Sequence, residues 1–189
     1  MCHALLQNPK LFLLLLHADE ELAGATRAGG CPCGGVLHRA DYPRKPRGFL
    51  NETIVEYGSR FSFCCNLCRK RTTSVSVRFL GRRVYLGLAV VLMSSRLIGP
   101  TSVTMRLSGT LGVPLRTLQR WRRWWRDSFP LTPLWQAACA RFMPPVDMNQ
   151  LPASLLARFA GPAEEQLMRL LVFLTPLTAS RPDTLQEGR

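Results

Sequence analysis

The clearest pattern of hydrophobic and polar positions lies in the segment Leu115–Arg126. Wound at about 100° per residue, its apolar side chains Leu118, Trp121 and Trp125 fall in one narrow arc. The other side of the same predicted helix consists of basic and amide side chains: Arg116, Gln119, Arg120, Arg122, Arg123 and Arg126. The pattern therefore predicts an amphipathic helix that packs one face against the protein and leaves a strongly basic face open to a partner.

A turn and a further helix are predicted immediately upstream. Gly112 tolerates the positive φ that a turn between helices needs, Val113 supplies an apolar plug, and Pro114 has a fixed φ suited to a first helical turn. Before them, apolar residues at i, i+4 spacing predict a first helix over Thr101–Thr110. This arrangement resembles a helix-turn-helix, in which the second helix is the recognition helix.

Charge narrows the choice of partner. The chain has 25 Lys and Arg residues against 12 Asp and Glu, a net charge of +13, and residues 31–126 hold 18 of the basic residues but only three acids. A solvated helix face normally mixes charge signs, and like charges at i, i+4 repel unless an anion offsets them. We therefore expect double-stranded DNA as the partner. The alternatives are a plain solvated face and a membrane surface, for which the segment lacks a Lys-rich amphipathic anchor.

Cysteines are the second informative feature. Cys65 and Cys68 have the C-x-x-C spacing that lets two thiolates converge on one tetrahedral zinc ion, and Cys31 and Cys33 form a second short turn followed by two glycines. In a cytosolic chain, such short-spaced pairs bind metal more often than they form disulfides. We predict one structural Zn2+ held by these four thiolates.

Two of the ligand positions stay open at this stage. The first turn is C-x-C, where C-x-x-C is commoner, so His38 is an alternative to Cys33. Cys64 is an alternative to Cys65, because adjacent residues cannot both point at the metal without an extra bend. The gap between the pairs contains alternating stretches at Thr53–Tyr57 and Arg60–Phe63, which predict a short hairpin. Cysteine turns that bracket strands resemble a zinc ribbon.

Other basic residues of the ribbon segment are candidate DNA contacts. Three of them lie in a proline-flanked stretch, which is either an arm that enters a minor groove or a solvated basic loop. Three more directly follow the second cysteine pair. These candidates are Arg44, Lys45, Arg47, Arg69, Lys70 and Arg71.

The rest of the chain is predicted to be helical. Asn8 and Pro9 begin a helix that extends to about Ala25 and ends before Gly29 and Gly30. Its apolar run Leu11–Leu16 is too short to span a bilayer, so we expect a cytoplasmic protein. Further helices are predicted at Val84–Met93, Leu134–Phe142, Pro152–Phe159 and Ala163–Leu174.

The predicted fold class is mainly α with a small β zinc ribbon. Its regions are an N-terminal helix (1–30), the ribbon with its basic loop (31–80), the helix-turn-helix (81–129), a C-terminal helical region (130–177) and a disordered tail (178–189).

Together, the ribbon cysteines and the motif L-G-V-P-L-R-T-L-Q-R-W resemble the DNA-binding regions of bacterial transposases and of small accessory proteins of mobile elements. The resemblance covers Cys31–Arg126 at most, and Pro114 stands where the pattern commonly has a capping Ser. It implies base or phosphate contacts from Arg116, Gln119, Arg120 and Arg123. It also implies a nucleoid-associated protein that has a recombinase or transposase as a possible partner.

The catalytic core of such elements is missing from the sequence. No set of acids forms a metal-binding triad on a predicted strand, and Tyr42, Tyr57 and Tyr85 lack the surrounding domain of a tyrosine recombinase. The motifs of a zinc deaminase are also missing. We therefore expect a non-catalytic, sequence-specific DNA-binding protein, an accessory or regulatory factor of a mobile element. A nuclease or recombinase component with an unrecognised active site and an RNA-binding or scaffold protein remain the alternatives.

Overall fold

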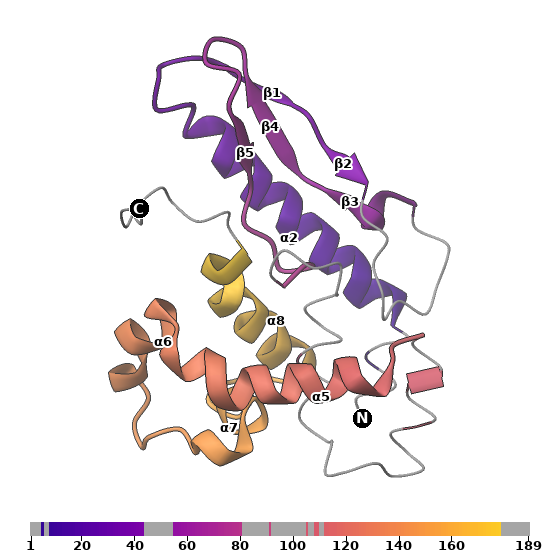
Figure 1. Ribbon diagram of the computed structural model, residues 1–189, viewed down its shortest axis with the longest axis vertical. Coiled ribbons are helices and arrows are strands. Elements are labelled where there is room, and N and C mark those ends of the chain that lie inside the picture. Colours follow the sequence, from indigo (N-terminus) through magenta and orange to yellow (C-terminus); the bar gives the residue numbers. More distant parts are fainter. Residues whose placement is uncertain are drawn as a thin grey trace.

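In the computed structural model, the chain is mainly helical with a small antiparallel sheet, as the sequence predicts (Figure 1). The structure describes residues 5, 8–43, 55–80, 91, 105, 108–109 and 112–178. Several predicted features lie wholly or mostly outside these residues: the Val84–Met93 helix except Val91, most of the Thr101–Thr110 helix, the arm residues Arg44, Lys45 and Arg47, and the tail after Thr178.

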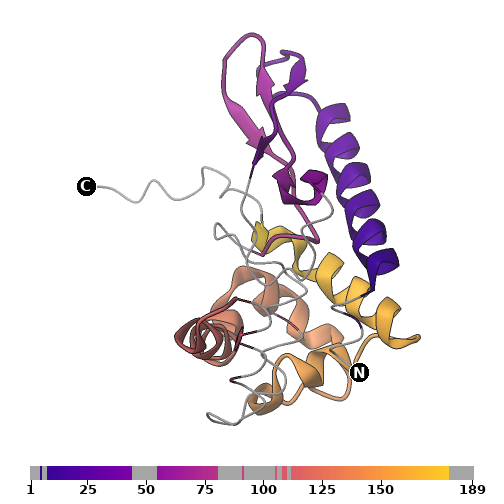
Figure 2. The same ribbon diagram turned by 90° about the vertical axis from the view of Figure 1, so that its right-hand side faces the viewer.

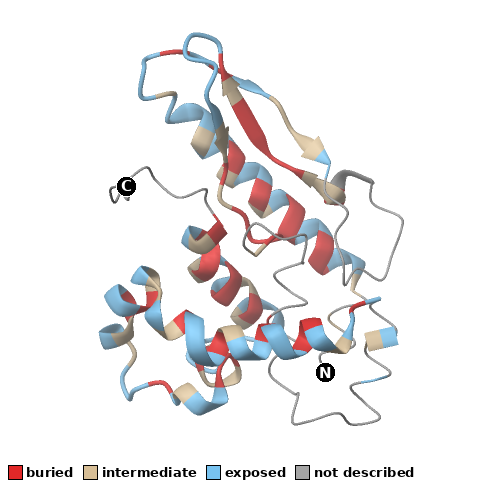
Figure 3. Cartoon of the chain, in the orientation of Figure 1, coloured by how far each residue is buried: buried red, intermediate tan, exposed pale blue. Residues whose placement is uncertain are grey.

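The N-terminal helix α2, Pro9–Ala28, begins where its capping residues predict. Asn8 accepts a hydrogen bond from the backbone N–H of Lys10 (3.0 Å), Pro9 occupies the first turn, and Gly29 follows the last residue. The helix extends about one turn beyond the predicted end at Ala25. Its apolar face is buried against the sheet and the other helices (Figure 3). Within the described residues, no helix combines the length and the apolar character needed to cross a membrane.

The sheet packs along α2 and joins both cysteine turns. Strands β1 (Leu37–Arg39), β4 (Ser62–Cys65) and β5 (Arg71–Thr73) pair antiparallel in the order β1-β4-β5. A two-stranded ladder pairs β2 (Tyr42–Pro43) with β3 (Ser59–Arg60). Strand β4 thus lies at the centre, and it leads directly into the second cysteine turn.

The predicted hairpin between Thr53–Tyr57 and Arg60–Phe63 is wrong. A 3-10 turn occupies Val55–Gly58, and the hairpin of the sheet is β4–β5, around the second cysteine turn. A buried arginine explains the difference. Arg78 donates hydrogen bonds from Nη1 to the carbonyl of Tyr57 (2.7 Å) and from Nη2 to that of Ser59 (2.9 Å), so these carbonyls are engaged by a side chain.

Arg78 is also one half of a fully buried ion pair with Asp19 of α2. Its Nε donates to Asp19 Oδ2 at 2.7 Å, and the two side chains are 0% and 2% exposed. The carboxylate accepts two further hydrogen bonds, from Ser76 Oγ and from the backbone N–H of Val77. Such a pair is tolerated in a core only when the remaining donors and acceptors are satisfied.

Aromatic rings enclose the Arg78 guanidinium. Its carbon lies 4.8 Å from the ring centroid of Phe61, 5.1 Å from that of Phe79 and 5.2 Å from that of Tyr57. The faces of these rings attract a cation, which offsets part of the desolvation cost. The ion pair therefore connects α2, the turn before the sheet and the segment after β5.

The C-terminal half consists of short helices around an aromatic core. Helix α5, Leu115–Arg123, continues as a π-helical turn, Trp124–Ser128. It is followed by α6 (Pro133–Ala138), α7 (Ala153–Leu156) and α8 (Ala163–Leu174). The prediction of Ala163–Leu174 is confirmed, and Gly161 before it has φ +105°.

The other two predicted helices are shorter than expected. Leu134–Phe142 is α-helical only to Ala138 and then 3-10, while Pro152–Phe159 keeps a single α-helical turn. In both places the chain shifts to i→i+3 hydrogen bonds, such as Arg158 N–H to the Leu155 carbonyl (3.0 Å). Burial of Trp135 and Ala138 in α6 and of Leu155 in α7 holds these turns without a long helix.

We expect Asp19→Ala to lower the free energy of unfolding by about 3–5 kcal/mol, because it leaves the Arg78 charge buried without its partner. Glu21→Ala, an exposed acid on the same helix, is the matched control and should change it by less than about 0.5 kcal/mol. Urea denaturation followed by far-ultraviolet circular dichroism measures both. Equal midpoints for the two variants would contradict the role given to the ion pair.

Candidate metal centre and basic helix face

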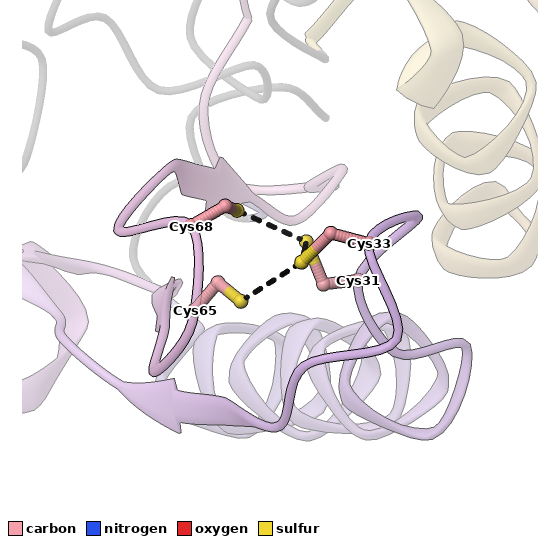
Figure 4. Close-up of side chains that lie close together, drawn as sticks. All are labelled: Cys31, Cys33, Cys65 and Cys68. Carbon is pink, nitrogen blue, oxygen red and sulfur yellow. Dashed lines mark hydrogen bonds between the residues drawn. The ribbon is translucent and has the colours of Figure 1, made fainter.

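Four cysteine side chains from the two turns converge on one point (Figure 4). The Sγ atoms of Cys31, Cys33, Cys65 and Cys68 all lie within 4.8 Å of one another. Cys33 Sγ is 3.4 Å from the Sγ atoms of both Cys31 and Cys65, and Cys31 Sγ is 3.6 Å from that of Cys68. These four are the thiolates that the sequence singled out as a ligand set.

The spacing of the sulfurs suits a tetrahedral ion. Four thiolates bound at about 2.3 Å from a central zinc are about 3.8 Å apart, close to the separations seen here. Cys65 is buried, Cys31 is half-buried and Cys33 is exposed, so the centre lies at the rim of the core. A site with four protein sulfurs has no open position, which is typical of structural rather than catalytic metal sites.

The two turns share one backbone device. The second cysteine of each is followed by a residue in the left-handed region, Gly34 at φ +80° and Arg69 at φ +59°. This conformation reverses the chain directly after the sulfur. In the second turn, Cys65 N–H then donates to the Lys70 carbonyl at 3.0 Å. Glycine adopts this conformation without steric cost, whereas Arg69 adopts it with a full side chain.

The turns are joined to each other through Gly35 and Asn66. Asn66 Oδ1 accepts from the backbone N–H of Val36 (2.8 Å), and Asn66 N–H donates to the Val36 carbonyl (3.0 Å). A Cβ at Gly35 would lie 2.4 Å from Cys65 Sγ and 2.9 Å from Asn66 Oδ1. Only glycine therefore lets the two cysteine turns approach. The glycine is evident from the sequence as part of the first cysteine turn, but the role of Asn66 is not. The one sequence feature that could have indicated this role is a short amide side chain inside a tight turn.

Electrostatics within the cluster favour a thiolate at Cys33 but a thiol at Cys31. The backbone N–H of Cys33 lowers the pKa of Cys31, but the side-chain hydrogen bond with Cys33 and those with the other cysteines raise it by more. The backbone N–H of Gly35 donates to Cys33, and with hydrogen bonds from Cys31 and Cys65 it lowers the pKa of Cys33 to about 6. Since the thiolate is the form that binds metal, Cys33 is prepared as a ligand near neutral pH.

The alternative ligands lie elsewhere. His38 is exposed on β1, directly across from Cys64 on β4. Cys64 Sγ lies 3.6 Å from the Arg69 carbonyl and 3.8 Å from the Cys65 carbonyl and is not one of the clustered sulfurs. Successive residues of a strand face opposite sides, which is why only Cys65 of the adjacent pair faces the other three cysteines.

Helix α5 separates its two faces as the sequence predicts. Leu118, Trp121 and Trp125 are 1%, 6% and 0% exposed, and Val113 before the helix is 1% exposed. Gly112 has the expected positive φ of +59°. All six polar residues of the other face are exposed: Arg116, Gln119, Arg120, Arg122, Arg123 and Arg126.

Two details of this helix differ from the sequence prediction. Pro114 precedes the first helical residue instead of occupying the first turn, with ψ 143°. Arg126 lies in the π-helical turn and forms an ion pair with Asp127, from Nε to Oδ1 at 2.6 Å. The hydrogen bond from Arg126 lowers the pKa of Asp127. Arg126 is therefore the one described member of the face that forms an ion pair with an acid, and the charge of Arg123 also acts on Asp127.

The remaining predicted DNA contacts that the structure describes lie in the β4–β5 turn and at the start of β5. Arg69 and Lys70 are exposed in the β4–β5 turn. Arg71 is exposed as well, but its Nη1 donates to the Ala40 carbonyl (3.2 Å) and to Ser62 Oγ (3.3 Å), so it also supports the sheet.

We expect Gly35→Ala to weaken metal binding by at least tenfold, because its Cβ would displace Cys65 Sγ from the cluster. Gly24→Ala is the matched control, since a Cβ on that helical glycine meets nothing within 4 Å. Competition with a chromophoric zinc chelator measures both affinities. Unchanged affinity in Gly35→Ala would show that the two turns do not need this close approach.

Comparison of the chain with protein-family models, with curated proteins and with solved structures found no match. The function is therefore inferred from the chemistry of the cysteine cluster and of the basic face of α5.

Proposed function

We propose that the protein is a non-catalytic, zinc-containing factor that binds double-stranded DNA in a sequence-specific way. The observation that supports this most is the basic face of α5, which lies exposed over a stripe of fully packed apolar side chains. A helix of this kind fits the major groove, which is about 12 Å wide.

The charges of this face are only partly compensated by an acid: Asp127 pairs with Arg126 and also interacts with the charge of Arg123. Among the described residues, none of Arg116, Arg120, Arg122 and Arg123 forms an ion pair with an acid. Phosphate groups of DNA would offset the repulsion between these neighbouring arginines. The planar guanidinium of an arginine can also donate two hydrogen bonds to guanine O6 and N7. We assign base or phosphate contacts to Arg116, Gln119, Arg120 and Arg123, and phosphate contacts to Arg122 and Arg126.

Zinc is the metal that suits four clustered thiolates with no open position. In this proposal the ion cross-links the two cysteine turns, and its part is structural. A factor with these properties and no catalytic centre fits an accessory or regulatory protein of a mobile element that acts on nucleoid DNA beside a recombinase or transposase.

Elemental analysis tests the metal. We expect about one equivalent of zinc in protein purified without chelator, and its loss in Cys68→Ser. Cys64→Ser is the matched control, since that sulfur lies outside the cluster, and it should keep full zinc. Less than half an equivalent in the wild-type protein, or full zinc in Cys68→Ser, would contradict the assigned ligand set.

Two substitutions on α5 separate DNA contact from packing. Arg120→Ala should leave the melting temperature unchanged and cost about 1–3 kcal/mol of binding to a duplex selected from a random library. Trp121→Ala should instead destabilise the fold by about 3–5 kcal/mol, because it removes a buried aromatic ring. Arg141→Ala, an exposed arginine on another segment, is the control for lost charge.

Fluorescence anisotropy over a salt series measures binding, and a thermal melt measures stability. The wild-type log-log salt slope should be about −4 to −8. Equal affinity of Arg120→Ala and wild type, or an equal loss in Arg141→Ala, would refute the recognition-helix assignment. Equal affinity for single-stranded RNA, or divalent-metal-dependent cleavage of the duplex, would replace a non-catalytic DNA-binding role by the corresponding alternative.

A further inference from the structure

The two basic surfaces lie at opposite ends of the molecule. The cysteine turns lie near the C-terminal end of α2, whereas α5 lies beyond its N-terminal end. Both views show this separation along the long axis of the molecule (Figures 1 and 2). Helix α2 has 20 residues and is therefore about 30 Å long. The turn that contains Arg69 and Lys70 and the helix α5 thus lie beyond opposite ends of a helix of this length.

The sheet and α5 also lie on one side of α2 (Figure 2). The inner face of the sheet is turned toward α2, because Arg39 and Phe63 line a cavity shared with Ala23 and Gly24 of that helix.

Residues of the opposite parity therefore face away from α2. His38, Cys64 and Arg71 are neighbours across the three strands on this outer face, and His38 and Arg71 are exposed. Arg69 and Lys70 extend the same basic edge into the β4–β5 turn. The outer edge of the ribbon is thus a second basic surface, separate from the arginines of α5.

We propose that this ribbon edge, Arg69 and Lys70, binds DNA phosphates about one helical turn away from the major groove that α5 enters. The inference rests on the proposed function of α5 and adds a second contact on the same duplex. One turn of B-DNA measures about 34–36 Å, so equivalent grooves on one face of a duplex recur at a spacing close to the length of α2, which lies between the two surfaces. Phosphate contacts of this kind fix register and orientation without reading sequence.

The metal centre gives this contact its rigidity. Arg69 follows a cluster cysteine directly, and the left-handed conformation at Arg69 sets the direction of the turn. A contact held in this way requires little ordering on binding, whereas a basic side chain on a mobile loop loses conformational freedom. The ribbon edge would then bind the duplex at a fixed distance from the recognition helix.

Hydroxyl-radical footprinting of the zinc-loaded full chain on a 40-bp duplex that contains its selected site tests the proposal. We expect two protected backbone patches about 10 bp apart. Protection of guanine N7 from methylation should be confined to the patch bound by α5. Binding to 24-bp duplexes should be at least tenfold tighter than binding to 12-bp duplexes centred on the guanine contacts.

The variant Arg69→Asn with Lys70→Gln tests the residues, because asparagine tolerates the left-handed conformation at position 69. It should lose only the outer patch and reduce the magnitude of the salt slope by about 2, since each phosphate contact contributes about 0.9. Lys10→Gln with Arg141→Gln, which removes two exposed charges elsewhere, is the matched control and should keep both patches.

The outcomes separate this inference from the function of α5. A single protected patch in the wild-type protein, or equal affinity for the two duplex lengths, would overturn the ribbon contact while leaving the recognition helix in place. Two patches that both survive in the Arg69, Lys70 variant would also overturn it. No duplex binding at all by the wild-type protein would overturn both proposals.

Discussion

Asp19 and Arg78 form the contact on which the arrangement of the N-terminal half depends. Both are buried, and the four hydrogen bonds around them tie α2 to the turn before β3 and to the segment after β5. A charge pair in such surroundings gains little as net stability, because desolvation offsets its attraction. Its effect is on specificity: any other packing of α2 on the sheet would leave one of the two charges unpaired.

This constraint places both candidate sites. The orientation of α2 fixes where the chain turns back at Gly29, and the first cysteine turn follows two residues later. The second turn leaves β4, the central strand of the sheet packed on α2. The core also extends to Leu118, Trp121 and Trp125, whose burial turns the arginines of α5 outward. One apolar core therefore supports a cysteine cluster at one end and a basic helix face at the other.

Features that depend on residues close together in the sequence could be predicted from the sequence alone. The caps of α2, the positive φ at Gly112, the two faces of α5 and the four clustered cysteines followed from residue type and spacing. The strand pairing did not, because β1, β4 and β5 are three or four residues long and their partners are distant in sequence. Arg78 was also missed as a buried residue: in a sequence it resembles the basic residues around it, and only its tertiary partner Asp19 distinguishes it. Asn66 was missed for the same reason, since its partner Val36 belongs to the other turn.

If the two cysteine turns, held together by the core, bind a single ion through four thiolates, the metal has only sulfur in its inner shell. X-ray absorption at the zinc K-edge of the purified protein tests this, because it reports the identity, number and distance of the atoms bound to the metal. We expect four sulfur scatterers at about 2.3 Å and no nitrogen or oxygen in the same shell. A shell that contains nitrogen or oxygen, or a spectrum without zinc, would contradict it.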